Sequence, residues 1–180
     1  AEEYGIKERF SNKTAIAPTA SISIICGGSS PGIEPIAANS FTHKTLSGSF
    51  NVRNKYLKKI LKKYDKDTDA VWSSITTNQG SVSHLDFLTA EEKDTFKTAF
   101  EIDQRWIVEL GADRTPHISQ AQSINVFVPA DIHKKELHDI HFQAWKKGLK
   151  SLYYCRSKSI QRAENVEAGS STDVTKNVYS

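Results

Sequence analysis

The feature that most constrains the fold is a succession of strand, helix and strand between residues 119 and 155. The segment from Ser119 to Phe127 looks extended and turns apolar towards its end, which predicts a buried strand. Asp131 is expected to cap a long helix whose apolar positions are Ile132, Leu137, Ile140, Ala144, Trp145 and Leu149, ended by Gly148. A strand from Ser151 to Cys155 follows directly. This βαβ pattern predicts parallel strands joined by a right-handed crossover, and therefore an α/β fold.

The rest of the chain supplies shorter elements on either side of a loop-rich start. Lys13 to Ala17 predicts a short strand, while the apolar run from Ser21 to Cys26 is compatible with helix or strand. Phe41 to Val52 predicts a two-stranded ribbon with a tight turn at Ser47 and Gly48. A helix is expected after Asn54, where the apolar stripe is Tyr56, Leu57, Ile60, Leu61 and Tyr64. A second is expected over 67–77, ended by Asn78 and Gly80, and a third from the capping box at Thr89 to about Phe100. A fourth is expected over 103–111.

Bulk composition excludes several classes of protein. A chain of 180 residues with 38% hydrophobic residues can bury one substantial core. Its net charge of +3 is too small an excess to indicate nucleic acid or a membrane surface, and no apolar run approaches the roughly 20 residues that span a bilayer. Cys26 and Cys155 form no CxxC pair, so neither a disulfide scaffold nor a zinc site is indicated, and a reducing cytoplasm is expected.

The stretch from Thr14 to Ile36 has the order of a phosphate cradle. A short apolar strand ends at Pro18 and leads into Thr19, Ala20 and Ser21, where small side chains leave backbone N–H groups open to an anion. The same residue types also make ordinary loops, and the chain has neither a P-loop nor a dinucleotide fingerprint. By its residues alone the stretch fits either interpretation.

Two adjacent tyrosines, Tyr153 and Tyr154, close the βαβ unit. Aromatic residues favour strands, so the pair is explained simply if one side chain points inward and the other outward. A phenol can also lose an electron and a proton together, which lets it carry a radical without creating a buried charge. The residues alone are compatible with both the structural role and the radical-carrying role.

Three motifs carry a resemblance to a known family. These are P-T-A-S-I-S-I-I-C-G-G-S-S-P-G-I-E-P from Pro18 to Pro35, S-I-N-V-F-V, and K-G-L-K-S-L-Y-Y-C-R-S. With the order of elements between them, they resemble the C-terminal part of a class I ribonucleotide reductase large subunit over about Ala1 to Glu164. The resemblance implies the C-terminal part of a ten-stranded α/β barrel, incomplete on its own, over residues 1–162. The composition after Arg162 is polar and short on large apolar residues, which predicts a flexible tail over 163–180.

The resemblance also implies functional residues. Binding of the diphosphate of a ribonucleoside diphosphate is expected at Thr19, Ala20, Ser21, Ile22 and Ser23. Tyr153 and Tyr154 are expected to relay a radical, in the reduction of ribonucleotides, from a tyrosyl or metal-centred oxidant in a small subunit. Shaping of the loop rather than contact with substrate is expected of Gly27, Gly28, Gly32, Glu34 and Pro35.

Catalytic thiols are the missing part of this resemblance. The family uses a thiyl-forming cysteine, a reducing pair and a further pair on its tail, and none has a matching position here. Cys26 and Cys155 are expected to be small packing residues. We therefore expect no cofactor in this chain and turnover only with a complementary N-terminal part of the large subunit and a small radical-generating subunit, as for a split gene product or a fragment.

Two other functions remain as alternatives. An adenosylcobalamin-dependent ribonucleotide reductase has a similar phosphate motif, but it needs no long-range relay and so gives the tyrosine pair no role. A non-catalytic phosphate-binding module would instead be a stable, cooperative monomer, whereas a partial barrel would expose strand edges.

Three histidines on the predicted long helix give a weak metal signal. His138 and His141 share a helix face and follow His133, but no third convergent ligand is evident, and helix packing or solvation is expected instead. No metal site is predicted.

Overall fold

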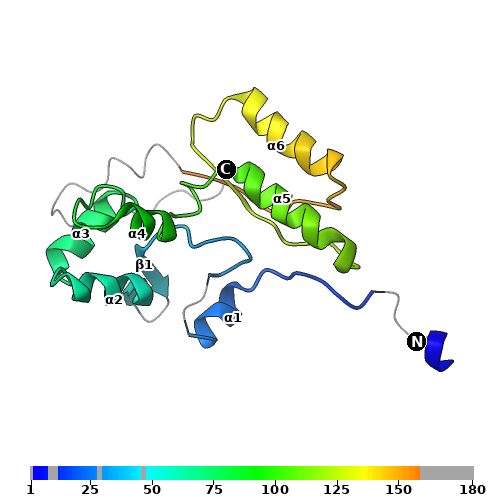
Figure 1. Ribbon diagram of the computed structural model, residues 1–180, viewed down its shortest axis with the longest axis horizontal. Helices are drawn as coiled ribbons and strands as arrows, with labels where there is room; N and C mark the ends of the chain where they lie inside the picture. The colour runs from blue at the N-terminus through cyan, green and yellow to red at the C-terminus, as the bar shows by residue number, and fades with distance from the viewer. Residues whose placement is uncertain (1, 8–11, 28–29, 46–47, 159–180) are drawn as a thin grey trace.

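The computed structural model describes residues 2–7, 12–27, 30–45 and 48–158 (Figure 1). The predicted tail, residues 163–180, lies outside them. The helices are η1 (Glu2–Tyr4), α1 (Ala20–Ile25), α2 (Lys55–Lys63), α3 (Asp69–Thr77), α4 (Ala90–Thr95), α5 (Gln104–Arg114), η2 (Thr115–His117) and α6 (Lys134–Lys146). The strands are β1 (Ser40–Thr45), β2 (Gly48–Arg53), β3 (Val126–Val128) and β4 (Cys155–Ser157). The chain is α/β, as predicted.

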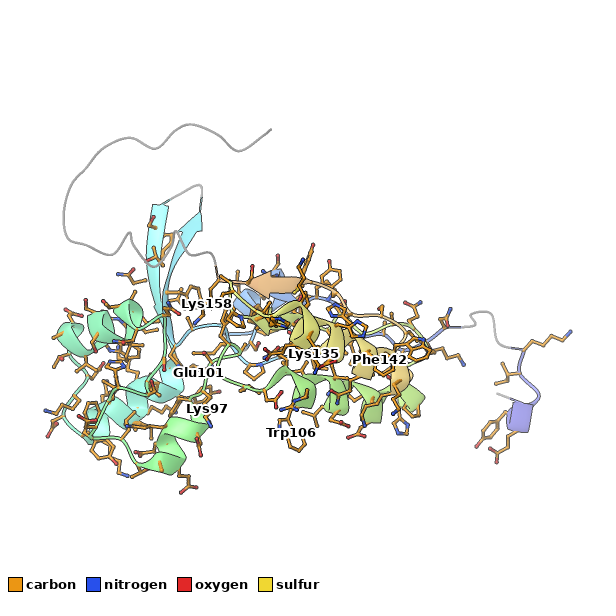
Figure 2. All side chains as sticks on the ribbon, turned by 90° about the horizontal axis from the view of Figure 1, so that it is seen from above. Lys97, Glu101, Trp106, Lys135, Phe142 and Lys158 are labelled. Carbon is orange, nitrogen blue, oxygen red and sulfur yellow. The ribbon has the colours of Figure 1, made fainter. Side chains whose placement is uncertain are left out.

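Helices α2, α3 and α4 form a group beside the β1–β2 ribbon (Figure 1). Each begins where a side chain caps it: Asn54 accepts from Tyr56 N, Thr68 from Val71 N, and Thr89 forms the predicted capping box. The helices enclose one core cluster, made of Leu57, Leu61, Trp72, Ile75, Val82, Leu85, Leu88 and Phe96. The antiparallel ribbon is also confirmed, and it extends away from the helices in Figure 2.

Buried Asn39 joins the ribbon to this helical group. Its N–H and its Nδ2 both donate to the carbonyl of Gly80, at 3.1 and 3.0 Å, and Nδ2 also donates to Phe96 O at 2.7 Å. Its Oδ1 accepts from Asn54 Nδ2 at 2.8 Å. One amide side chain therefore fixes the start of β1 against the end of α3 and the end of α4.

Parallel pairing joins three segments that are distant in sequence. Val126 pairs with Cys155 and Val128 with Ser157 in parallel register, which confirms the βαβ unit with α6 as its crossover. On the other side, Ile16 forms a parallel bridge with Gln122, so the predicted strand at 13–17 is reduced to this short pairing. The segment 120–128 is therefore central, and the handedness of the crossover stays a prediction.

Helices α5 and α6 lie side by side and pack on the central segment (Figure 1). The second core cluster contains Val108 from α5, Val126 and Val128 from β3, and Ile140 and Ala144 from α6. The described strands make two sheets of two strands each, so this part of the chain closes no barrel. No helix among the described residues is long and apolar enough to cross a membrane.

Two predicted helix ends are wrong because tertiary contacts decide them. Helix α4 stops at Thr95, short of Phe100, since Thr98 N donates to Glu101 Oε2 at 2.8 Å and Ala99 N donates to Ile36 O at 2.9 Å. Helix α5 continues through Gly111 to Arg114. A Cβ at Gly111 would lie 2.7 Å from Ile124 Cδ1, so this glycine permits close packing rather than ending the helix.

The predicted boundaries around α6 also shift. His133, not Asp131, is the N-cap, because its side chain accepts from Lys135 N at 3.2 Å. Trp145 was predicted to lie on the apolar stripe, yet 73% of it is exposed. Strand β4 begins at Cys155, where the prediction had placed the end of the strand.

Candidate functional site

The predicted phosphate segment forms the start of α1. Thr19 is the N-cap, with φ −110° and ψ 30°, and its side chain makes no capping hydrogen bond. The first N–H groups of any helix have no acceptor within the helix, which leaves those of Ala20, Ser21 and Ile22 at an exposed end. The partial positive charge of a helix N-terminus and small side chains beside it suit an anion.

Ser23 differs from the other four predicted phosphate-binding residues. It is buried, its N–H donates to Thr19 O at 2.8 Å and its hydroxyl donates to Ala20 O at 2.7 Å. Both of its donors are thus used within the helix. The structure leaves the amides of Ala20, Ser21 and Ile22 as the open donors of this segment.

The loop after α1 is held by contacts to other elements. Gly27, at φ 87°, accepts from Lys55 Nζ on α2 at 2.5 Å. Glu34 is 5% exposed and its carboxylate accepts from both the N–H and the side-chain amide of Asn125. These contacts fit the loop-shaping role expected of Gly27 and Glu34, while Gly28 lies outside the described residues.

The two tyrosines pack on each other. Their ring centroids are 4.1 Å apart, and Tyr153 Oη donates to Tyr154 Oη over 3.5 Å. They are 47% and 52% exposed, so the alternative with one inward and one outward side chain is wrong. The pair precedes the regular strand β4, and only its backbone joins the sheet, with Tyr153 N donating to Ile124 O and Val126 N donating to Tyr154 O, each at 2.8 Å.

Neighbouring groups adjust the acidity of Tyr153. The hydrogen bond with Tyr154 is the main cause that raises the pKa of Tyr153 above its ordinary value, and the positive charge of Arg156 opposes it. The guanidinium of Arg156 lies 5.2 Å from the centre of the Tyr154 ring. The contact between the two phenols therefore makes Tyr153 a weaker acid than an ordinary tyrosine.

Both cysteines are exposed, so the expectation that they are packing residues is wrong. Cys26 follows the last residue of α1 as its C-cap, and Cys155 begins β4. Each lies where a short element ends or begins, rather than in either core cluster.

The three histidines of the 131–146 segment do not converge. His133 caps α6, His138 stacks on Phe142 with 5.9 Å between ring centroids, and His141 Nδ1 lies 2.8 Å from Leu137 O. Among the described residues, no three His, Cys, Asp or Glu side chains are grouped closely enough to hold a metal ion.

Sequence reasoning missed an exposed apolar surface on α5 and α6. Trp106 and Leu110 on α5, with Phe142 and Trp145 on α6, are between 49% and 73% exposed, and Trp106 projects away from α5 in Figure 2. These residues lie on helix faces other than the one that buries Ile140, and their helical spacing in the sequence could have indicated this surface. A nearby hollow is lined by Phe100, Asp103, Arg105, Pro129, Ile132 and Glu136, and none of the predicted site residues lines it.

Comparisons with known proteins point to one family. A family model described as "Ribonucleotide reductase, barrel domain" matches residues 1–155. The ribonucleoside-diphosphate reductase large subunit of Invertebrate iridescent virus 6 is 49% identical over 168 residues, which are 91% of this chain and 18% of the viral protein. That of Caenorhabditis elegans is 35% identical, over 87% of this chain and 19% of the worm protein.

A solved structure agrees with these sequence relatives. The class Id ribonucleotide reductase alpha subunit of Actinobacillus ureae superposes with a TM-score of 0.76 at 37% identity. The alignment covers 91% of this chain and 29% of that one. The chain thus spans less than a third of the length of each of these three proteins.

Proposed function

Because this chain belongs to the ribonucleotide reductase barrel-domain family, we propose that it supplies the diphosphate-binding wall and part of the radical path of a ribonucleoside-diphosphate reductase large subunit. The reaction would be reduction of ribonucleotides to deoxyribonucleotides. The relatives reported above are named as ribonucleotide or ribonucleoside-diphosphate reductases, and none of those names specifies a cobalamin-dependent enzyme or a regulator.

The diphosphate would bind at the start of α1. The amides of Ala20, Ser21 and Ile22, at the first positions of α1, would supply the N–H donors, and the hydroxyls of Thr19 and Ser21 would add to them. Ser23 would act indirectly, because its hydrogen bonds to Thr19 and Ala20 hold the first turn in shape.

The tyrosine pair would move one oxidising equivalent. One phenol gives an electron and its proton to an oxidant and becomes a neutral radical. That radical takes a hydrogen atom from the neighbouring phenol across the 3.5 Å contact between the two oxygens. The second radical then takes a hydrogen atom from a cysteine thiol. Each step exchanges one O–H or S–H bond for another, and no net charge is left on the pair.

Parts of the enzyme outside these 180 residues would complete the reaction. We place the oxidant, metal-centred or tyrosyl, in a small subunit, and the reacting thiols in a complementary N-terminal part of the large subunit, because neither Cys26 nor Cys155 matches a family position for them. A cytoplasmic location follows from the same proposal, since the thiols must be kept reduced.

The observation that carries the proposal is that both candidate segments pair with the central segment, residues 120–128. The phosphate segment follows Ile16, which pairs with one edge of the central segment at Gln122. The tyrosines pair through their backbones with its other edge, at Ile124 and Val126. A substrate held at α1 and a radical carried by the tyrosines would therefore share one rigid support.

A chimera tests this function. The matching segment of the Invertebrate iridescent virus 6 large subunit is replaced by this chain, and deoxyribonucleotide formation is measured with that virus's small subunit. We expect turnover in the chimera, and its loss in Tyr153→Phe and in Tyr154→Phe with substrate binding retained. The matched control is Tyr56→Phe, which changes an exposed phenol on α2. An inactive chimera that folds, or full activity in Tyr154→Phe, would contradict the proposal.

A further inference from the structure

The central segment has two edges, and side chains complete one of them. Alternate N–H groups of a strand point to opposite edges. On the edge facing Ile16, Ser123 N donates to Ile16 O at 2.8 Å, and Phe127 N donates to the side chain of Gln104 at 2.8 Å. Between them, Asn125 N donates to Glu34 Oε1. After the chain turns away at Pro18, Glu34 and Gln104 thus take the place of a neighbouring strand.

The contact between Glu34 and Asn125 is deeply buried. Glu34 is 5% exposed and Asn125 is 9% exposed. The second carboxylate oxygen of Glu34 accepts from Asn125 Nδ2 at 3.1 Å. A buried carboxylate is costly unless it is hydrogen-bonded, so these two donors account for its being tolerated there. The side-chain oxygen of Asn125 is itself buried without a donor.

The loop is built around this carboxylate. A Cβ at Gly32 would lie 2.5 Å from Glu34 Oε2, so a larger residue there would require the end of the Glu34 side chain to shift. The hydroxyl of Ser30 donates to the carbonyl of Glu34 and closes the turn. Two residues outside the contact are thus adapted to it.

Glu34 lies between the two parts of the proposed site. It belongs to the loop that leaves α1, and its partner Asn125 lies between Ile124 and Val126, which pair with Tyr153 and Tyr154. We propose that Glu34 is a positioning residue of the reductase site. By completing the edge of the central segment, it fixes the phosphate-binding segment relative to the tyrosine pair. This rests on the function proposed above and extends it to a residue that touches neither substrate nor radical.

The test asks whether Glu34 acts as a hydrogen-bond acceptor or through its negative charge. In Glu34→Met an apolar chain of similar length leaves Asn125 N–H without a partner. Gly32→Ala keeps the carboxylate but displaces it. In Glu34→Gln the remaining side-chain oxygen still accepts from the Asn125 N–H. The new NH₂ can donate to the Asn125 side-chain oxygen once the Asn125 side-chain amide has flipped. Glu91→Met, on the exposed first turn of α4, is the matched control.

Two measurements decide the proposal. In the 180-residue chain, hydrogen exchange of the Asn125 and Tyr153 amides is expected to accelerate about tenfold in Glu34→Met and Gly32→Ala, and to stay near wild type in Glu34→Gln and Glu91→Met. In the chimera, the first two variants are expected to raise KM for the ribonucleoside diphosphate by about tenfold, and Glu34→Gln is expected to restore it.

The outcomes are distinguishable. Unchanged exchange in Glu34→Met overturns the inference, and so does faster exchange with an unchanged KM, which would make Glu34 merely structural. Loss of KM rescue in Glu34→Gln overturns it as well, because charge would then matter more than hydrogen bonding. If the unmodified chimera binds no diphosphate, the proposed function fails, and the link between Glu34 and the central strand is then judged by the exchange data alone.

Discussion

Replacing Gly80 by alanine is expected to be among the most damaging single-methyl additions to this fold. Gly80 has φ 82°, in the left-handed region, where a side chain costs about 1–2 kcal/mol. An added Cβ would also lie 2.3 Å from Ala38 Cβ and 2.6 Å from Ala38 Cα. Because one of these is a backbone atom, the neighbouring chain must move, and such overpacking costs about 1–3 kcal/mol.

Movement of Ala38 carries a further cost. The adjacent Asn39 donates twice to the Gly80 carbonyl, and each weakened hydrogen bond costs about 1 kcal/mol. We therefore expect Gly80→Ala to lower the free energy of unfolding by about 4–7 kcal/mol. The matched control is Gly148→Ala: Gly148 has φ 79° but nothing within 4 Å of its added Cβ, so only the conformational cost of about 1–2 kcal/mol applies.

Urea unfolding followed by far-ultraviolet circular dichroism measures both variants. Trp72 fluorescence adds a local probe, since Trp72 is 1% exposed in the core beside Gly80, whereas Trp106 and Trp145 are 64% and 73% exposed. The reasoning is refuted if the two variants lose stability equally, within about 0.5 kcal/mol, because the close approach to Ala38 would then contribute nothing.

Three further predictions concern single contacts. Thr89→Ala removes the capping box and should cost about 1 kcal/mol in urea unfolding, whereas exposed Thr77→Ala should cost much less; equal losses would contradict the cap. The pKa of Glu92 is lowered, chiefly because Thr89 N–H donates to it, so this contribution to stability holds above the ordinary glutamate range and is lost as pH falls through the lowered pKa. Melting temperatures against pH should therefore decline less steeply in Glu92→Gln, and parallel curves would refute this. Tyr154→Phe should bring the pKa of Tyr153 down towards that of a free phenol in an absorbance titration, and an unchanged or higher value would argue against the contact.

Elements set by local signals could be predicted from the sequence. Helices α2 and α3 begin at Asn54 and Thr68, whose side chains cap them, and α3 stops where Asn78 and Gly80 make the chain turn. The ribbon follows from alternation around a tight turn. In each case the deciding atoms lie within a few residues of the boundary.

Elements set by distant partners could not be predicted. The end of α4 depends on the carbonyl of Ile36, and the passage of α5 through Gly111 depends on Ile124. The position of Trp145 shows the same limit, because helical periodicity identifies an apolar residue without showing whether anything covers it.

The candidate site also has features that local sequence predicts and features that depend on distant contacts. Small residues after Pro18 indicated a backbone site for an anion, and the structure does leave amide donors there. The burial of Ser23, the packing of the Tyr153 ring against the Tyr154 ring and the exposure of Cys155 could not be predicted, since each depends on what the folded chain places around the residue. The contact of Glu34 with Asn125 joins residues that are 91 positions apart, and no spacing rule reaches that far.

The central position of segment 120–128 also has a consequence for synthesis. The helical group uses contacts that are close in sequence, so it can fold as soon as it leaves the ribosome. The parallel pairing must wait: Lys13 N donates to Ser119 Oγ, 106 residues later, and the opposite edge needs residues 153–157. Until residues 155–157 emerge, the apolar strand Val126–Val128 lacks its parallel partner β4 and is open to aggregation. A nascent chain of this design would depend on chaperones mainly while residues 129–157 are being translated.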